Sequence, residues 1–425
     1  MRFFKARILP VAVAAGLLAG ALAPAASAVQ SVPYQLGTVT SGPAPDGCPK
    51  QGNYTCSGLT VSCPGVREVG HAYLATTQPT TTLRGAVALF SSSRGDETWT
   101  GDFRSGKEFV TELRAKGMRV IQVWWEKPWL AAAPGEIVGV PKLACRPASV
   151  IRWLHDHTSL PAASPGRCGF CVSGSSAGAS QIAYALARYG LESRIDVAVL
   201  TSGPPHGSLA TACDGTDPAA LGAMGARKLH DLAYGFLDGG GPCESKDEGW
   251  TPRWTADSVE ATGDFVYSRT AVRFIFGDTD PVAIHHAQVY ADRLAGAGSP
   301  DVEVAVVQGM PHNIQNSDAG LAVLKAALTG GSFPGTVPSV APSAEPTTGG
   351  TDGSASPSPS AKPGRTKGPK ASGGKTKGGV AQRRQDDSGP GLWLVVAVVA
   401  ACAAAGGTYY LRRRGTGSPP EPPAS

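Results

Sequence analysis

The middle of the chain alternates between short apolar runs and longer stretches with apolar residues at helical spacing. Gly85–Phe90 (GAVALF) is apolar at every position, which is typical of a strand buried on both faces of a sheet. Further strands are predicted at residues 119–125, 169–172, 197–201, 272–276 and 302–307, after an opening pair at 59–62 and 67–76. Helices are predicted between them, at residues 109–116, 147–155, 179–189, 284–294 and 319–328.

This alternation predicts an α/β fold with a mainly parallel sheet flanked by helices on both faces. Residues of about 208–262 interrupt the rhythm between two predicted strands, and we expect them to form a small inserted cap. The folded body is expected to span residues 29–331.

The N-terminal 28 residues have the organisation of a secretory signal peptide. Three basic residues (Arg2, Lys5 and Arg7) precede an apolar run at residues 8–22, and Ala26-Ser27-Ala28 follows as a small-residue cleavage site. The apolar run is short for a retained anchor helix, so cleavage near Ala28 is predicted.

Residues 391–411 form a stretch without a formal charge that is long enough to cross a bilayer as a helix. Trp393 lies near one end, and Tyr409 and Tyr410 lie near the other, as expected at membrane interfaces. Residues 412–425 are predicted to form a cytoplasmic tail, because they begin with the basic residues 412–414. This orientation places the body outside the cell. Arg383 and Arg384 oppose this orientation by charge, but the signal peptide already sets the direction.

Residues 332–390 are rich in Pro, Ser, Thr, Gly and Lys, with almost no large apolar residue, and predict a disordered stalk. Of the net charge of +5, residues 1–28 carry +3, residues 335–389 carry +4 and the end after Leu411 carries +2. The body is therefore mildly acidic, at −4. This argues against a nucleic-acid binder, whose basic charge lies on its folded part.

Eight of the nine cysteines lie in the body, at positions 48, 56, 63, 145, 168, 171, 213 and 243. An even number in an exported chain predicts up to four disulfides. Cys213–Cys243 is the one pair we predict, because both residues fall inside the cap. Cys168-Gly-Phe-Cys171 has the spacing of a redox pair, but Cys171 falls in a predicted strand, which favours a structural role.

The segment Gly174-Ser175-Ser176-Ala177-Gly178 matches the pattern G-x-S-x-G. The pattern alone is weak in a chain rich in Gly and Ser. Its context is informative, because it stands between a predicted strand and a predicted helix, where a nucleophile elbow is required. Ser176 is thus the predicted nucleophile.

A serine nucleophile requires a base and an acid that orients it. Asp280 lies in the loop GDTDPV after one predicted strand, and His312 lies in the loop QGMPH after the next. Both loops follow the carboxyl ends of buried strands, where ligands bind in open α/β sheets. Asp278 is an alternative acid.

These three segments, GSSAG, GDTDPV and GMPH, resemble the α/β-hydrolase superfamily over about residues 59–329. The resemblance implies that Ser176 attacks a carbonyl, His312 transfers the proton and Asp280 orients the imidazole. It also implies an oxyanion hole made by the backbone N–H of Ala177 and an N–H from the loop after Gly85–Phe90. That loop reads SSSRG where the superfamily usually has His-Gly or a glycine run, so Ser93 is favoured and Ser92 is the alternative.

Other polar and aromatic residues have weaker claims to a site. His206 follows a strand end and lines the pocket in one interpretation, whereas His285 and His286 are expected to be exposed. His71 and His230 have no partner that the sequence indicates. His155-Asp156-His157 lacks a third metal ligand. The tryptophans 99, 124, 125 and 129 either form an acyl pocket or pack in the core.

The combined interpretation is a membrane-anchored serine hydrolase with its catalytic domain outside the cell, most simply a carboxylic ester hydrolase that works through an acyl-enzyme. The choice of esters comes from analogy with the fold. A peptidase, an amidase or an acyltransferase has the same triad, and a non-catalytic surface binding module is the alternative from another class. Expected partners are a small-molecule or lipid ester and the membrane, with no nucleic acid. No metal or organic cofactor is indicated.

Overall fold

The computed structural model describes residues 33–49, 53–161, 167–214, 226–331 and 333. The chain divides into two units, Met1–Glu345 and Pro346–Ser425, and the described residues all lie in the first. The predicted signal peptide, transmembrane segment and cytoplasmic tail lie outside the described residues, as does the stalk apart from Phe333. None of the helices in the described ranges has the length and apolar character needed to span a bilayer.

Within the described residues, nine strands form one sheet in the order β1-β2-β3-β5-β4-β6-β7-β8-β9. The first four strands of this order pair antiparallel, and every pair from β5 onward is parallel. The strands are β1 (Thr38–Gly42), β2 (Thr55–Ser62), β3 (Gly70–Thr77), β4 (Gly85–Phe90), β5 (Met118–Trp125), β6 (Phe170–Ser175), β7 (Val197–Thr201), β8 (Ala271–Gly277) and β9 (Val302–Val307). In the parallel part of the sheet, β4 comes first in the chain, β5 pairs on one side of it, and β6 pairs on the other side and is followed outward by β7, β8 and β9.

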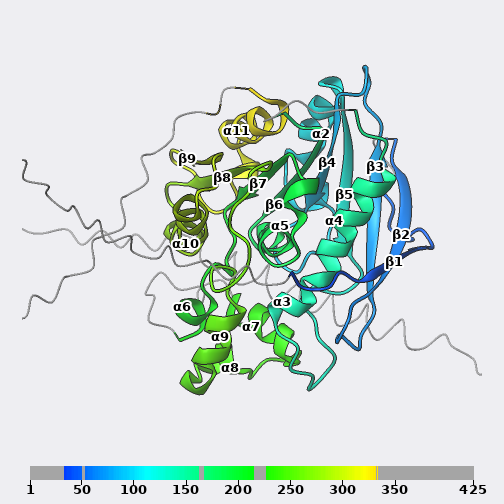
Figure 1. The fold of residues 1–425 in the computed structure, drawn as a ribbon. Coiled ribbons are helices and arrows are strands. Elements are labelled where there is room, and N and C mark those ends of the chain that lie inside the picture. Colours follow the sequence, from blue (N-terminus) through cyan, green and yellow to red (C-terminus); the bar gives the residue numbers. More distant parts are fainter. Residues whose placement is uncertain (1–32, 50–52, 162–166, 215–225, 332, 334–425) are drawn as a thin grey trace, which may run out of the picture. The chain divides into compact units, whose positions relative to one another are not determined.

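Helices cover both faces of this sheet (Figure 1). One face packs against α1 (Trp99–Asp102), α2 (Gly106–Ala115) and α11 (Asp318–Thr329), and the other packs against α4 (Cys145–His157), α5 (Ala177–Ala187) and α10 (Pro281–Ala297). Strand β4 serves both cores, because Val87 and Leu89 point to the first face and Ala88 and Phe90 to the second. Because both faces of β4 are buried, the sequence of this strand is apolar at every position.

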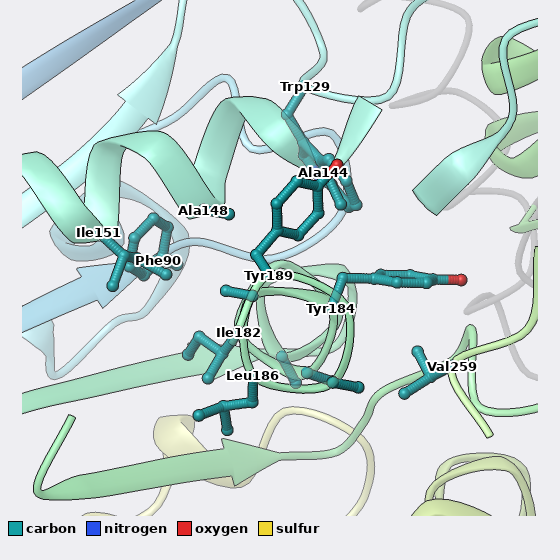
Figure 2. Close-up of a cluster of buried hydrophobic side chains, with 14 of the residues drawn as sticks. Phe90, Trp129, Ala144, Ala148, Ile151, Ile182, Tyr184, Leu186, Tyr189 and Val259 are labelled. Carbon is teal, nitrogen blue, oxygen red and sulfur yellow. The ribbon is translucent and has the colours of Figure 1, made fainter. Parts of the chain in front are cut away.

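Helix α5 is buried along its whole length, and Figure 2 shows it end-on among its neighbours. Tyr184, in the C-terminal half of α5, and Tyr189, just after its end, donate hydrogen bonds of 2.6 Å to backbone carbonyls, Tyr184 to Asp257 and Tyr189 to Pro141. Their rings thus remain in the apolar core while each hydroxyl is satisfied. The helix that follows Ser176 is therefore held on all sides.

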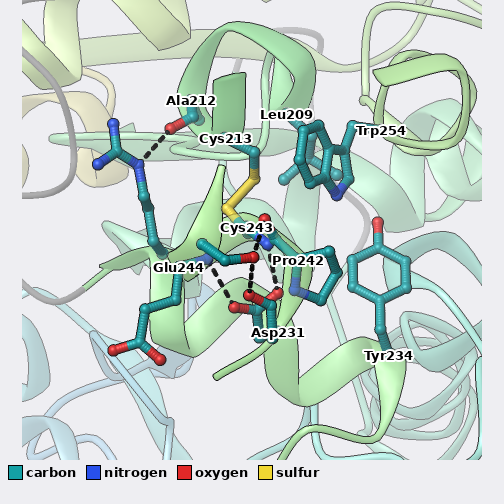
Figure 3. Close-up of a disulfide and its surroundings, with 12 residues drawn as sticks. Leu209, Ala212, Cys213, Asp231, Tyr234, Pro242, Cys243, Glu244 and Trp254 are labelled. Carbon is teal, nitrogen blue, oxygen red and sulfur yellow. Dashed lines mark hydrogen bonds between the residues drawn. A yellow bond between two sulfur atoms is a disulfide. The ribbon is translucent and has the colours of Figure 1, made fainter. Parts of the chain in front are cut away.

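The cap stands between β7 and β8, and its helices are short (Figure 1). They are α6 (Leu209–Asp214), α7 (Ala226–Asp231), α8 (Pro242–Ser245) and α9 (Thr251–Asp257), with 3-10 turns at Leu232–Tyr234 and Glu248–Trp250. Figure 3 shows the Cys213–Cys243 disulfide that joins α6 to α8, as the sequence predicts. Beside it, the Asp231 carboxylate accepts hydrogen bonds of 2.8 Å from the backbone N–H groups of Cys243 and Glu244, which start α8.

The other body cysteines are also paired. The disulfides are Cys48–Cys56, Cys63–Cys145 and Cys168–Cys171. Cys168–Cys171 is buried at the start of β6, in agreement with the structural role that its position favours. Cys63–Cys145 joins the end of β2 to the first residue of α4 and so ties the antiparallel part of the sheet to the helical layer.

Several secondary-structure elements differ from those predicted from the sequence. Strand β1 was not predicted, because TVTSG is short, largely exposed and has no apolar alternation. Strand β6 continues three residues beyond the predicted end, to Ser175, and α5 begins directly after Ser176. Helix α3 (Val140–Leu143) and the 3-10 turns were also not predicted, since single turns carry little periodicity.

The Cys63–Cys145 disulfide closes the longest loop of the four, at a separation of 82 residues. A cross-link of this span restricts the unfolded chain strongly, so the double variant C63S/C145S is expected to lose between about 3 and 5 kcal/mol of unfolding free energy. Denaturant unfolding of the two proteins measures this loss. The C48S/C56S variant, which opens a loop of 8 residues, is the matched control and is expected to lose less unfolding free energy. Equal losses in the two variants would contradict the larger stabilising effect expected of Cys63–Cys145.

Candidate active site

Ser176 stands at a sharp turn between β6 and α5. Its backbone has φ 51° and ψ −119°, a conformation that costs free energy for any residue with a side chain. Two backbone hydrogen bonds hold the turn, from Ser176 N to the carbonyl of Thr201 on β7 (2.8 Å) and from Ala179 N to the carbonyl of Ser176 (2.9 Å). The serine is therefore presented at the end of the central parallel strand, directly before a helix N-terminus.

The two glycines of the motif are required by close backbone contacts. A Cβ at Gly174 would lie 2.4 Å from the backbone of Gly178, and a Cβ at Gly178 would lie 2.4 Å from the carbonyl oxygen of Ser91. Both distances are far shorter than van der Waals contact. The first glycine lets the turn close on itself, and the second lets α5 approach the end of β4.

His312 and Asp280 form a direct pair. His312 Nδ1 lies 2.7 Å from Asp280 Oδ2, and Asp280 is buried while the imidazole is partly exposed. Asp280 follows β8 and also accepts a hydrogen bond from Ala283 N at the start of α10. The alternative acid, Asp278, is used differently: its Oδ1 accepts from Met310 N (3.1 Å) and so holds the loop that carries His312.

Ser176 and His312 line the same cavity, which has a volume of about 440 Å³. It lies at the carboxyl ends of the parallel strands and is covered by the cap. The cap and the start of α10 supply apolar lining from Leu229, Leu232, Leu237 and Val282. Among the described residues of this lining there are two cations, Arg94 and Lys228, and no carboxylate.

The loop after β4 reaches this cavity through Ser92, Ser93 and Arg94, next to Ala177. The N–H of Ser92 donates to Asp102 Oδ2 (2.9 Å), so it is not available to a ligand. The N–H of Ser93 has no acceptor within the described part of the chain, and its φ of 48° places the residue in the left-handed region. Of the two alternatives for the second N–H, the geometry therefore favours Ser93.

The strand order, the antiparallel strands at one edge and the turn at Ser176 together define the architecture. The fold is that of the α/β-hydrolase superfamily. In that fold the nucleophile follows a central parallel strand, and the acid and the base follow later strands of the same sheet. In this chain Ser176 follows β6, Asp280 follows β8 and His312 follows β9.

No protein-family model and no curated protein matches this sequence. Similar solved structures include a puromycin hydrolase, with 17% identity over 71% of this chain and 40% of that chain, and a TM-score of 0.40. Others are a hyperthermophilic esterase from Pyrobaculum calidifontis (15% identity, 64% and 83% covered, TM-score 0.41) and a bacterial heroin esterase (16% identity, 69% and 82% covered, TM-score 0.41).

The tryptophans that follow the strand ends are core residues. Trp99, Trp125 and Trp129 are each 1% exposed, and none of the four lines the cavity at Ser176. Trp125 Nε1 donates to Gln181 on α5 (3.0 Å), which links β5 to the helix that follows Ser176. The apolar lining of the cavity comes instead from leucines of the cap. The sequence pattern did not indicate them, because the short helices and turns of the cap carry little periodicity.

His155-Asp156-His157 at the end of α4 is a surface ion cluster. Asp156 pairs with Arg152, Arg194 and His155, and this network lowers the pKa of its carboxyl. The described residues contain no group of His, Cys, Asp or Glu side chains arranged to hold a metal ion.

Three fully buried histidines lie together beneath the cap: His206 after β7, His230 on α7 and His286 on α10. The expected exposure of His286 was wrong, because the second turn of α10 places this side chain next to His230 of the cap. The rings of His206 and His230 are 4.5 Å apart, and His206 Nδ1 lies 2.5 Å from Ser180 Oγ on α5. Burial lowers the pKa of His206 well below its usual range, and burial with the neighbouring charges of His286 and Arg227 lowers that of His230 to about 3.

This buried group predicts a loss of stability in acid. Between its usual pKa of 6.5 and about 3, His230 binds a proton in the unfolded chain and not in the folded one, so the unfolding free energy falls as pH falls through this window. The slope is up to about 1.4 kcal/mol per pH unit for each such histidine. We expect H230Q to flatten the dependence measured by denaturant unfolding between pH 7 and 4, whereas H71Q, at an exposed histidine, leaves it unchanged; equal slopes in H230Q and the parent would contradict this.

Proposed function

We propose that this protein is a serine hydrolase that cleaves carboxylic esters with Ser176 as nucleophile, His312 as base and Asp280 as the orienting acid. The observation that carries the proposal is the 2.7 Å His312–Asp280 pair, whose imidazole lines the same cavity as a serine held in a strained turn. Strain of this kind persists only where the surroundings impose it, and it is characteristic of functional sites.

The geometry gives each group a defined part in acyl transfer. Asp280 accepts a hydrogen bond from the Nδ1–H of His312, which leaves Nε2 as the basic nitrogen that takes the Ser176 proton during attack on the ester carbonyl. The tetrahedral oxyanion receives hydrogen bonds from the N–H groups of Ala177 and Ser93, and the N-terminus of α5 adds a favourable dipole. His312 then protonates the leaving alcohol, and water repeats the sequence on the acyl-enzyme.

The cavity also favours a class of ester. Its apolar walls from the cap suit an acyl chain, while Arg94 and Lys228 give it a positive potential. The Lys228 ammonium has a single contact in the described residues, at 3.4 Å from the Asp238 carbonyl oxygen, and Arg94 Nε pairs with Asp96 at the surface. Neutral or acidic esters are therefore the proposed substrates, and cationic esters are disfavoured by charge repulsion.

The proposed location is the outer face of the cell membrane. The signal-peptide pattern of residues 1–28, the apolar segment 391–411 and the four disulfides of the body support export and tethering. A peptidase, an amidase or an acyltransferase would use the same triad. The non-catalytic binding module is disfavoured by the complete Ser176, His312 and Asp280 arrangement.

The role of Ser176 is tested with a fluorophosphonate probe on the purified full-length protein. We expect covalent labelling that disappears in S176A, and a loss of about 10⁴- to 10⁶-fold in kcat/KM on p-nitrophenyl esters. The control is S175A, at the neighbouring residue, whose hydroxyl is buried in β6 and which is expected to keep the label. Labelling of S176A, or no labelling of the folded parent protein, would refute the hydrolase proposal.

The charge preference is tested with a pair of esters of equal size, one neutral and one carrying a carboxylate. K228Q is expected to raise KM for the anionic ester by about two- to fivefold, as for a solvent-exposed ion pair, and to leave KM for the neutral ester unchanged. K142Q removes an exposed lysine on α3, outside the cavity, and is the matched control. An equal rise for both esters would show that Lys228 acts on the shape of the cap rather than on charge.

A further inference from the structure

A single carboxylate holds the loop that supplies the second oxyanion donor. Asp102 Oδ2 accepts hydrogen bonds from both the N–H (2.9 Å) and the hydroxyl (3.2 Å) of Ser92. Asp102 does not line the cavity at Ser176, so it has no contact with a substrate there. Its effect on the reaction must pass through Ser92.

Backbone hydrogen bonds also hold the loop. Gly95 N donates to the Ser92 carbonyl (2.9 Å) and closes the turn, and Trp125 N donates to the Gly95 carbonyl (2.7 Å) and ties the turn to β5. Ser93 lies inside this turn with its φ of 48°, exposed to solvent, without a hydrogen bond of its own in the described residues. A non-glycine residue in this region needs support from its neighbours, and the Ser92–Asp102 bonds supply it on one side.

Asp102 is itself placed by α1, which is hydrogen-bonded to the sheet. It is the last residue of α1, whose first turn is capped by Thr98. Thr100 of this helix donates two hydrogen bonds to the buried Gln122 on β5, from its N–H (2.9 Å) and its hydroxyl (3.0 Å). The carboxylate is thus fixed to the sheet independently of the loop that it holds.

The Asp102 carboxyl group changes its charge near pH 6. Burial raises the pKa of Asp102 to about 6; the hydrogen bonds from Ser92 lower it, and the like charge of Glu97 raises it. Glu97 is the charged group that acts on Asp102 from the same segment, and Gln122, on the strand against which α1 packs, is neutral. Asp102 is therefore an anion above about pH 6 and a neutral acid below it.

We propose that ionised Asp102 is a positioning residue for catalysis, which holds Ser92 so that the N–H of Ser93 points to the oxyanion formed at Ser176. In the ionised form both Ser92 bonds are charge-assisted, and the N–H bond at 2.9 Å is the shorter of the two. Protonation leaves a neutral acceptor, weakens both bonds and lets the strained turn relax. This inference rests on the proposed function. It adds that the protonation state of Asp102 controls the activity of the same site.

The test compares full-length wild-type protein with D102N, which keeps the shape of the neutral acid. An oxyanion donor acts on the transition state and not on bound substrate, so kcat is expected to fall about tenfold at pH 8 with KM within twofold of wild type. The wild type should also show an additional tenfold step in kcat near pH 6, which is absent in D102N. E97Q removes the like charge and is expected to move this step to lower pH.

A second readout follows the oxyanion directly. An alkyl boronic acid forms a tetrahedral adduct with an activated serine, and its inhibition constant should rise in D102N by the same factor by which kcat/KM falls. S92A removes the bond at 3.2 Å and keeps the N–H bond, so it is expected to lose two- to threefold in kcat. E108Q, on the exposed side of α2, is the matched control for a lost acid and is expected to behave as wild type.

The outcomes separate this inference from the proposed function. If fluorophosphonate labels the wild type and D102N has unchanged kcat, boronate inhibition and pH profile, Asp102 has no positioning role although the hydrolase proposal stands. A D102N variant with a lower kcat, a higher KM and a lower thermal midpoint would point to a structural role of Asp102. An S92A variant with unchanged kcat would then overturn the inference. No labelling of the wild type would overturn both proposals.

Discussion

The close approach of α5 to the end of β4 is the contact on which the site depends. Gly178 lies so near the carbonyl oxygens of Phe90 and Ser91 that no other residue fits. This contact brings the first turn of α5, and with it Ala177, beside the loop that contains Ser93. The strained backbone of Ser176 is the consequence of joining a central strand to a helix packed this closely. Its cost, of order 1–3 kcal/mol, is offset by the burial of the whole of α5.

The buried strands were predictable because they lie in the middle of the sheet. Val197–Thr201 is a strand at the predicted residues, the predicted residues 272–276 lie within β8, and GAVALF is β4 from its first residue to its last. Strand β1 escaped prediction for the opposite reason, since an exposed edge strand needs no apolar pattern. The cap was recognised by its interruption of the rhythm, but its short helices carry too little periodicity to be located individually.

For the site, the sequence indicated the residues and the structure added their relations. The choice of Asp280 over Asp278 followed from position in the turn, and the structure assigns the two carboxylates to different partners, His312 and the backbone of Met310. The anchoring role of Asp102 could not be predicted, because a hydrogen bond between residues 92 and 102 across an irregular loop leaves no periodic signal. The same holds for His206, His230 and His286, which three separate segments bring together under the cap.

The position of His312 has a consequence for the synthesis of the chain. The imidazole follows β9, the last strand to be made and the outer edge of the sheet, whereas Ser176 is in place much earlier along the chain. Under the proposed mechanism, a growing chain that already contains Ser176 lacks the base until β9 and the loop after it have been synthesised and paired. Reactivity would then be acquired only after β9 joins the sheet, and a chain truncated before β9 would carry an unactivated serine.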